Sequence, residues 1–158
     1  MSRAFTREDD NDAGIAGLGE RPVSPHRNLV TESGLAQIER EITSLREELG
    51  RAESEADRAR IATLSRDLRY WASRRETAEL SVPDAASDVV RFGMAVTIEA
   101  EDGRRQTWRI VGEDEADAAS GSISHVSPMA RALFGKKVGD LVTVSGREWE
   151  ILELMTPA

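Results

Sequence analysis

The chain has 158 residues, a formal net charge of −8, 32% charged residues and 39% hydrophobic residues. This length and composition fit one or two small domains of a soluble protein. The absence of cysteine excludes disulfides and a thiol nucleophile, and the acidic balance makes the chain a poor autonomous binder of nucleic acid. With no apolar run near the roughly 18 residues of a membrane span and no signal-peptide core, we expect no membrane partner and a cytoplasmic location.

The first 28 residues carry an acidic run at Asp9 to Asp12 and then four glycine or proline breakers from Gly14 to Pro22. No apolar periodicity crosses them, so this segment is predicted to be a disordered lead.

Residues 29–81 are predicted to form a helical hairpin with a coiled-coil seam. Thr31 can cap the first helix and Gly50 can end it, and Ser54 with Asp57 has the spacing of a capping box for the second. Each helix has apolar residues three and four positions apart: Leu35, Ile38, Ile42, Leu45 and Leu49, then Ile61, Leu64, Leu68 and Trp71. The two stripes are out of phase across the gap, which favours two antiparallel helices over one rod.

Residues 82–88 are predicted to be a linker, and residues 89–158 a small domain rich in strands. Apolar and polar residues alternate from Val96 to Ala100, and Asp102-Gly103 is a hairpin turn before a return strand at 107–111. Ile123 falls in a short strand, Ser127-Pro128 opens a short helix that ends at Gly135, and the strands 141–144 and 149–152 pair across Ser145-Gly146. The pattern alone predicts an α+β fold with an antiparallel sheet.

One stretch of this domain carries a family resemblance. Its residues are Phe92-Gly93, Ile110-Val111-Gly112, Asp114-Glu115-Ala116-Asp117, Gly121-Ser122-Ile123-Ser124, Ser127-Pro128 and Ala130 to Asp140. In one register, they resemble the C-terminal domain of the Gre (GreA/GreB) transcription elongation factors. The likeness extends over residues 28–155, since Val30 to Leu35 resembles the family's helix opening. It implies an FK506-binding-protein-like fold for the β-rich domain.

The resemblance also implies a partner and a mode of action. Gre factors dock on bacterial RNA polymerase, at a rim element of its β′ subunit, and pass a helical hairpin into the secondary channel. We therefore expect a monomeric regulator of elongation with no enzymatic activity of its own, no cofactor and no metal, and with DNA binding implied only at the level of the family. The docking residues implied by the match are Ile123, Ser124, Ser127, Pro128, Met129 and Arg131.

The hairpin tip departs from the family pattern. The string Asp-x-x-Glu followed by Asn-Ala-Glu-Tyr, which cleavage-stimulating members carry between the helices, is missing. The hairpin is also about twenty residues shorter than in typical GreA, so each arm loses about 15 Å at 1.5 Å per residue. The tip acids Glu53, Glu55 and Asp57 fit helix capping better than metal binding. The sequence thus resembles short-hairpin relatives such as the regulator of nucleoside diphosphate kinase and predicts no stimulation of transcript cleavage.

Alternative functions stay open at this point. Glu53, Glu55 and Asp57 could still serve a true cleavage stimulator, and the implied fold raises a peptidyl-prolyl isomerase, although the aromatic residues of the domain are patterned as core. A helicase is excluded because Gly135-Lys136 lacks the upstream glycine of a phosphate loop. Arg58, Arg66 and Arg69 are possible basic contacts on the second helix, and His125 is expected at the surface.

Overall fold

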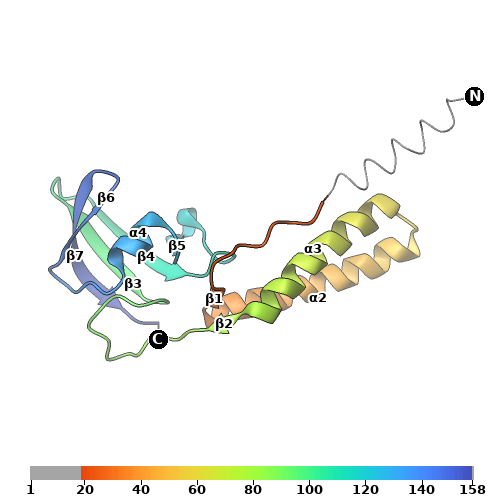
Figure 1. Cartoon of the computed structure of the whole chain (residues 1–158), viewed down its shortest axis with the longest axis horizontal. Coiled ribbons are helices and arrows are strands. Elements are labelled where there is room, and N and C mark those ends of the chain that lie inside the picture. Colours follow the sequence, from red (N-terminus) through yellow and green to blue (C-terminus); the bar gives the residue numbers. More distant parts are fainter. Residues whose placement is uncertain (1–18, 158) are drawn as a thin grey trace, which may run out of the picture. The chain divides into compact units, whose positions relative to one another are not determined.

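The computed structural model describes residues 19–157 (Figure 1). Its elements in chain order are β1 (Leu29–Val30), α2 (Glu32–Ser54), α3 (Arg58–Thr77), β2 (Glu79–Leu80), β3 (Ala95–Ala100), β4 (Arg105–Val111), η1 (Ala118–Ser120), β5 (Ser122–Ser124), α4 (Pro128–Leu133), β6 (Leu141–Val144) and β7 (Arg147–Met155). The chain is therefore α+β, with two long helices followed by a strand-rich region. None of the helices described is long and apolar enough to cross a membrane.

The described residues divide into two compact units. We call residues 19–25 and 38–77 the helical unit, and residues 26–37 and 78–157 the sheet unit. The predicted disordered lead is wrong for its described residues, 19–28. Ion pairs and a cation–π contact attach Glu20 and Arg21 to α3, and Asn28 is buried, with its carbonyl accepting from the Glu79 amide at 2.8 Å. Residues 1–18 of that prediction lie outside the described residues. The predicted domain boundaries and the linker at 82–88 stay predictions.

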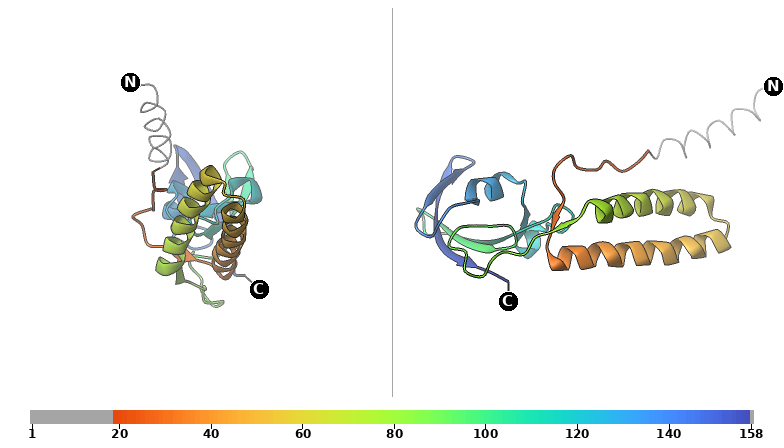
Figure 2. Two further views of the ribbon diagram at one scale, coloured as in Figure 1. Left: turned by 90° about the vertical axis from the view of Figure 1, so that its right-hand side faces the viewer. Right: turned by 60° about the horizontal axis from the view of Figure 1, so that its bottom comes forward.

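In the helical unit, α2 and α3 run antiparallel and side by side (Figure 2). The predicted stripes supply five of the buried residues, with Ile38, Ile42 and Leu45 from α2 and Leu64 and Trp71 from α3, while Ala52 and Arg74 are buried outside the stripes. Burial of such side chains is what keeps two amphipathic helices together in water. The hairpin is therefore present, whereas its description as a coiled coil stays a prediction.

The turn between the two helices lies later in the sequence than predicted. Gly50 does not end α2, which continues to Ser54, and Ala52 in this last turn is completely buried. That burial offsets the unfavourable helix propensity of Gly50. Ala56, with φ of 53°, takes the left-handed conformation expected of the glycine. The capping box at Ser54 is also wrong, since the Ser54 hydroxyl donates to the Gly50 carbonyl within α2.

The sheet unit contains a five-stranded sheet in the order β5-β4-β3-β7-β6. β3 pairs antiparallel with β4 and with β7, and β6 pairs antiparallel with β7. The predicted antiparallel sheet differs at one edge, where β5 runs parallel to β4. The reason is the long connection through η1, which lets the chain return in the same direction rather than through a tight hairpin.

One core joins α4 to the sheet. Val96, Ile98, Ile110 and Ile151 are fully buried in the strands, and Ala130 and Leu133 of α4 are equally buried against them. The tight turn between β6 and β7 has positive φ at both Ser145 and Gly146, as a two-residue hairpin loop requires. The predicted hairpins and the period-two pattern of the strands are confirmed by this arrangement.

A small second sheet was not predicted. Leu29 and Val30 pair in parallel with Glu79 and Leu80, and an ion pair joins Arg27 to Glu79 at 2.9 Å. Gly112 lies under this segment, because a Cβ at its position would come within 2.5 Å of the Leu29 carbonyl oxygen. These contacts place residues 26–37, including the first residues of α2, in the sheet unit.

Candidate functional site

The six residues that the sequence singled out for docking lie together at one edge of the five-stranded sheet. We call residues 122–131 the β5–α4 loop, since β5 forms the sheet edge and α4 starts at Pro128. Ser127 is the N-cap of α4, as predicted, with its hydroxyl oxygen accepting from the Ala130 amide at 3.3 Å. Pro128 occupies the start of the helix, where its missing amide proton costs nothing. The helix ends at Leu133, slightly before the predicted Gly135.

Side chains of the β5–α4 loop divide into an inner and an outer set. Ile123 and Met129 are half-buried and pack against the core. Pro128 and Arg131 are exposed. Within the loop, Ser124 accepts from the Val126 amide through its hydroxyl at 3.2 Å. The loop therefore exposes Pro128 and Arg131 to solvent, while Ile123 and Met129 anchor its backbone to the core.

His125 corrects the expectation of a surface residue. Its side chain is buried, its ring meets Phe92 edge-on at 5.6 Å between centroids, and its amide donates to the Val111 carbonyl at 2.9 Å. Nε2 is buried without a hydrogen-bond partner. Burial lowers the pKa of His125 below its ordinary value, against an opposing effect of the Glu113 carboxylate. A lone histidine between a strand and a helix gave no periodicity from which this burial could be predicted.

The acidic turn after β4 is held by hydroxyl and amide groups. Glu115 accepts a hydrogen bond from the Thr31 hydroxyl, which in turn accepts from the Gly34 amide at 3.0 Å and caps α2 as predicted. Asp117 accepts from the Ala119 amide at 3.1 Å and so caps η1. The carboxylates of this turn thus hold the local backbone together within the sheet unit.

The tip acids lie at the turn between α2 and α3. Asp57 caps α3, because its Oδ1 accepts from the Arg60 amide at 3.2 Å. The cap is therefore Asp57 itself and not Ser54, which the predicted capping box had placed there. Glu55 is 3.7 Å from the Arg60 guanidinium. Glu53 is exposed near the end of α2. Across residues 19–157, no group of three or more His, Asp or Glu residues is placed to hold a metal ion.

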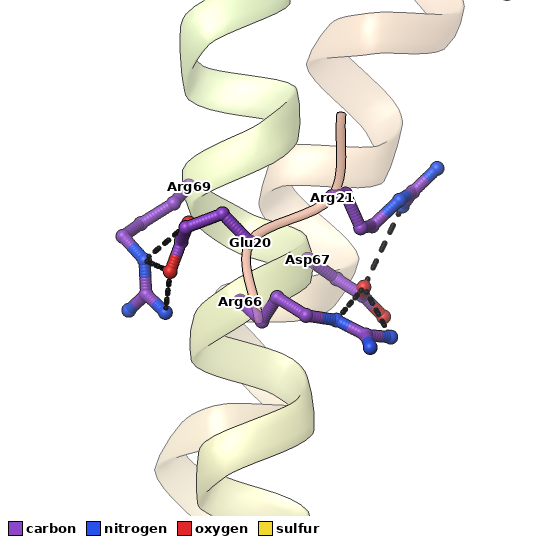
Figure 3. A network of polar contacts seen from close by, with 5 residues as sticks. All are labelled: Glu20, Arg21, Arg66, Asp67 and Arg69. Carbon is purple, nitrogen blue, oxygen red and sulfur yellow. Dashed lines mark hydrogen bonds and ion pairs between the residues drawn. The ribbon is translucent and has the colours of Figure 1, made fainter. Parts of the chain in front are cut away.

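The three candidate basic contacts on α3 have different surroundings. Arg58 is exposed at the first residue of the helix. Arg66 pairs with Asp67 at 3.2 Å and Arg69 pairs with Glu20 at 2.6 Å, so both are engaged with acids of this chain (Figure 3). The contact with Glu20 was missed by sequence reasoning, because 49 residues separate the partners.

Comparison with known proteins identifies the family. A family model described as the C-terminal domain of the transcription elongation factors GreA and GreB matches residues 85–155. The transcription elongation factor GreA of Bradyrhizobium sp. (strain BTAi1) is 38% identical over 141 residues, which cover 73% of this chain and 85% of that protein. The chain belongs to the GreA/GreB family. The matched C-terminal region lies in the sheet unit and contains the whole β5–α4 loop.

Other GreA/GreB relatives match over shorter or more divergent stretches. GreA of Azorhizobium caulinodans is 46% identical over 87 residues, covering 52% of this chain and 54% of that protein, so the match spans about half of that relative. Among solved structures, the GreA factor homolog 1 of Thermus thermophilus is 22% identical, with a TM-score of 0.40 over 82% of this chain and 99% of that one. The FK506-binding-protein-like description of the sheet unit stays a prediction.

Proposed function

We propose that this GreA/GreB-family chain is a monomeric transcription elongation factor that binds RNA polymerase through the β5–α4 loop. The observation that carries the proposal is the exposure of Pro128 and Arg131 on a capped helix at the edge of the sheet. The family match over residues 85–155 supports it, because it includes this edge. The partner site would be the β′ rim element at the mouth of the secondary channel.

The β5–α4 loop is suited to docking because little of it needs to be ordered on binding. Ile123 and Met129 pack on the core, Ala130 is fully buried, and Ser127 fixes the first turn of α4. A partner that meets such an edge avoids most of the cost of immobilising a flexible loop. Arg131 then offers a planar guanidinium for a carboxylate on the partner.

We further propose that the chain regulates elongation without stimulating transcript cleavage. Cleavage stimulation needs free carboxylates delivered to the polymerase metal with ångström-level accuracy. Here the Asp57 carboxylate is engaged as a helix cap, and Glu55 has a cation beside it. With 23 residues, α2 is about 35 Å long at 1.5 Å per residue. The tip is therefore better suited to occupying the channel, in competition with other channel ligands, than to stimulating transcript cleavage there.

Competition for core RNA polymerase tests the docking proposal. The chain should displace a labelled GreA from core polymerase, and Arg131→Glu should weaken that displacement at least tenfold, which corresponds to about 1.4 kcal/mol. Arg104→Glu is the matched control, since it makes the same charge change at an exposed position in the turn between β3 and β4. Failure of the wild-type chain to bind polymerase, or equal losses in both variants, would contradict the proposal.

A backtracked elongation complex tests the absence of cleavage stimulation. The chain should bind such a complex without accelerating the release of short 3′ RNA fragments. If fragments appear, and the combined variant Glu53→Gln, Glu55→Gln and Asp57→Asn abolishes them, the tip acids have the catalytic use that the proposal denies. A GreA protein with the family's acidic tip provides the positive control.

A further inference from the structure

The segment that precedes the sheet unit lies along α3 rather than away from it. We call residues 19–25 the strap. Within it, Glu20 meets Arg69 through both carboxylate oxygens, with Arg69 Nε 3.0 Å from each oxygen and Nη2 2.6 Å from Oε1 (Figure 3). This hydrogen bonding to Arg69 lowers the pKa of the Glu20 carboxyl. The first strap contact is therefore an acid of the strap on a base of the helix.

The second strap contact has the opposite polarity. Arg21 Nη1 lies 3.5 Å from Asp67 Oδ1, the oxygen that Arg66 also contacts (Figure 3). The Arg21 guanidinium carbon lies 3.9 Å from the centroid of the Tyr70 ring and 5.9 Å from that of Trp71. A cation above an aromatic face is attracted by the ring's electron density. The strap thus places a base on an acidic and aromatic part of α3.

The surface under the strap has two charges of opposite sign side by side. We call Asp67, Arg69 and Tyr70 the α3 face. Its ligand must bring an acid to Arg69 and a cation to Asp67 and Tyr70, as the adjacent residues Glu20 and Arg21 do. A phosphate backbone would satisfy Arg69 but would bring no cation to Asp67 and Tyr70, where Arg21 lies. The α3 face therefore suits an extended polypeptide with neighbouring acidic and basic side chains.

The strap is built to be displaced. The side chains of Glu20 and Arg69 keep 63% and 58% of their exposure, so water and salt screen their ion pair. Val23 is 46% exposed and adds little apolar burial. Pro22 and Pro25 restrict the backbone, which reduces the entropy lost when the strap settles on the helix. The Arg21 and Asp67 side chains are more buried, 36% and 23% exposed, so Arg21 holds the strap more firmly than Glu20 does. The Glu20 contact resists a competing segment only weakly.

We propose that the strap is an autoinhibitory cover: it occupies the α3 face in the free chain and leaves when an extended acidic and basic segment of RNA polymerase takes its place. This regulation rests on the polymerase binding proposed above. In this proposal Arg69 contacts the polymerase segment only after the strap has left it. The strap then lowers the affinity of the free chain for polymerase by the fraction of molecules in which the face is covered.

Strap closure can be measured in the full chain without polymerase. The chain has no cysteine, so a nitroxide on Val23→Cys gives a single probe whose broadening of the Tyr70 and Trp71 NMR signals reports closure. Exchange of the two charges, with Glu20→Arg and Arg21→Glu, keeps composition and net charge and should abolish the broadening. Adding Arg69→Glu and Asp67→Arg to that exchange restores opposite charges across both contacts and should recover it. The matched control Glu99→Arg with Arg105→Glu exchanges a partly exposed ion pair between β3 and β4 and should leave the broadening unchanged.

Polymerase affinity tests the inhibitory role. If the strap covers the face in about 70 to 90% of molecules, the Glu20 and Arg21 exchange should tighten binding to core polymerase about three- to tenfold. Unchanged or weaker binding would overturn the proposal, because the strap would then be inert or part of the interface. If neither the wild-type chain nor any variant binds polymerase, while the NMR signals still report closure, the docking proposal fails and the inhibitory role fails with it. If the wild-type chain binds polymerase but its NMR signals show no closure, only the strap proposal is refuted.

The chemistry of the displacing segment can be tested separately. A peptide with the sequence of residues 19–25, added to the exchanged variant, should shift the NMR signals of Arg69 and Tyr70, and a peptide with Glu20 and Arg21 interchanged should not. A single-stranded RNA of seven nucleotides should leave these signals in place. Stronger shifts with the RNA than with the peptide would overturn the assignment of a polypeptide ligand.

Discussion

The β5–α4 loop and the turn at the hairpin tip use the same local chemistry with different results. In each, a side-chain oxygen caps a helix, with Ser127 3.3 Å from the Ala130 amide and Asp57 3.2 Å from the Arg60 amide. Behind Ser127, α4 contributes the fully buried Ala130 and Leu133 to the core. Around Asp57, which is half-buried, residues 53–56 and 58–60 are by contrast exposed. A helix cap thus produces a rigid surface only where the capped helix also packs against the core.

The largest loss of stability should come from Leu133→Ala, which removes core packing behind the β5–α4 loop. The side chain is fully buried, so its removal should lower the free energy of unfolding by about 2 to 5 kcal/mol through lost burial and a cavity. Urea unfolding of the full chain, followed by tryptophan fluorescence, measures the change. Arg131→Ala on the exposed side of α4 is the control and should stay within about 0.5 kcal/mol of the wild type. A loss below about 1 kcal/mol for Leu133→Ala would mean that the core does not fix the loop.

The two caps provide a matched pair of smaller effects. Ser127→Ala and Asp57→Ala should each cost about 1 kcal/mol of stability, since each leaves a helix amide without its acceptor. Only Ser127→Ala should also weaken binding to core polymerase, because only that cap holds a proposed docking edge. Thermal unfolding and the competition assay together check this difference. Equal losses of polymerase binding in both variants would erase the functional contrast between the two turns.

A smaller effect should appear in the pH dependence of stability. Burial lowers the pKa of His125 in the folded chain, so the unfolded chain binds more protons between that lowered value and the ordinary value of about 6.5. Stability should therefore fall as the pH drops through this window and be fully present above it. Urea midpoints at pH 7.5 and 5.5 measure the loss, and His125→Phe should reduce it. If the wild-type midpoint instead rises on acidification, the assigned direction is wrong.

The smallest effect is expected from the exposed tip acids. Glu53→Gln with Glu55→Gln should change stability by no more than about 0.5 kcal/mol, because neither carboxylate is buried. Circular dichroism during thermal unfolding checks this expectation. A larger loss would show that the Glu55 contact with Arg60 contributes more than an exposed ion pair normally does.

Sequence patterns predicted the structural features that depend on residues close together in the chain. The phase shift between the two apolar stripes predicted the antiparallel helices, and Ser145-Gly146 predicted the turn that the structure confirms. The cap at Ser127 followed from the serine and proline pair. Each of these features is encoded within one or two turns of chain, where spacing and turn chemistry dominate.

Features that depend on distant residues were missed. The contact of Glu20 with Arg69 and the pairing of Val30 with Leu80 join segments about fifty residues apart, and neither has a periodic signal. The continuation of α2 past Gly50 brings Ala52 into a fully buried position, and this burial overrides a local stop signal. The docking residues came from family resemblance, and the strap from the structure alone.

The pairing of β1 with β2 makes the sheet unit a discontinuous domain. Val30 is buried in it and Leu29 packs against its core, although both precede α2 in the chain. A fragment cut at the linker would therefore lack an integral piece of its own fold and would expose the surface that Gly112 keeps open for the Leu29 carbonyl. Grafting or circular permutation of this domain would have to carry residues 26–37 along, joined to residue 78 by a short bridge in place of the helices.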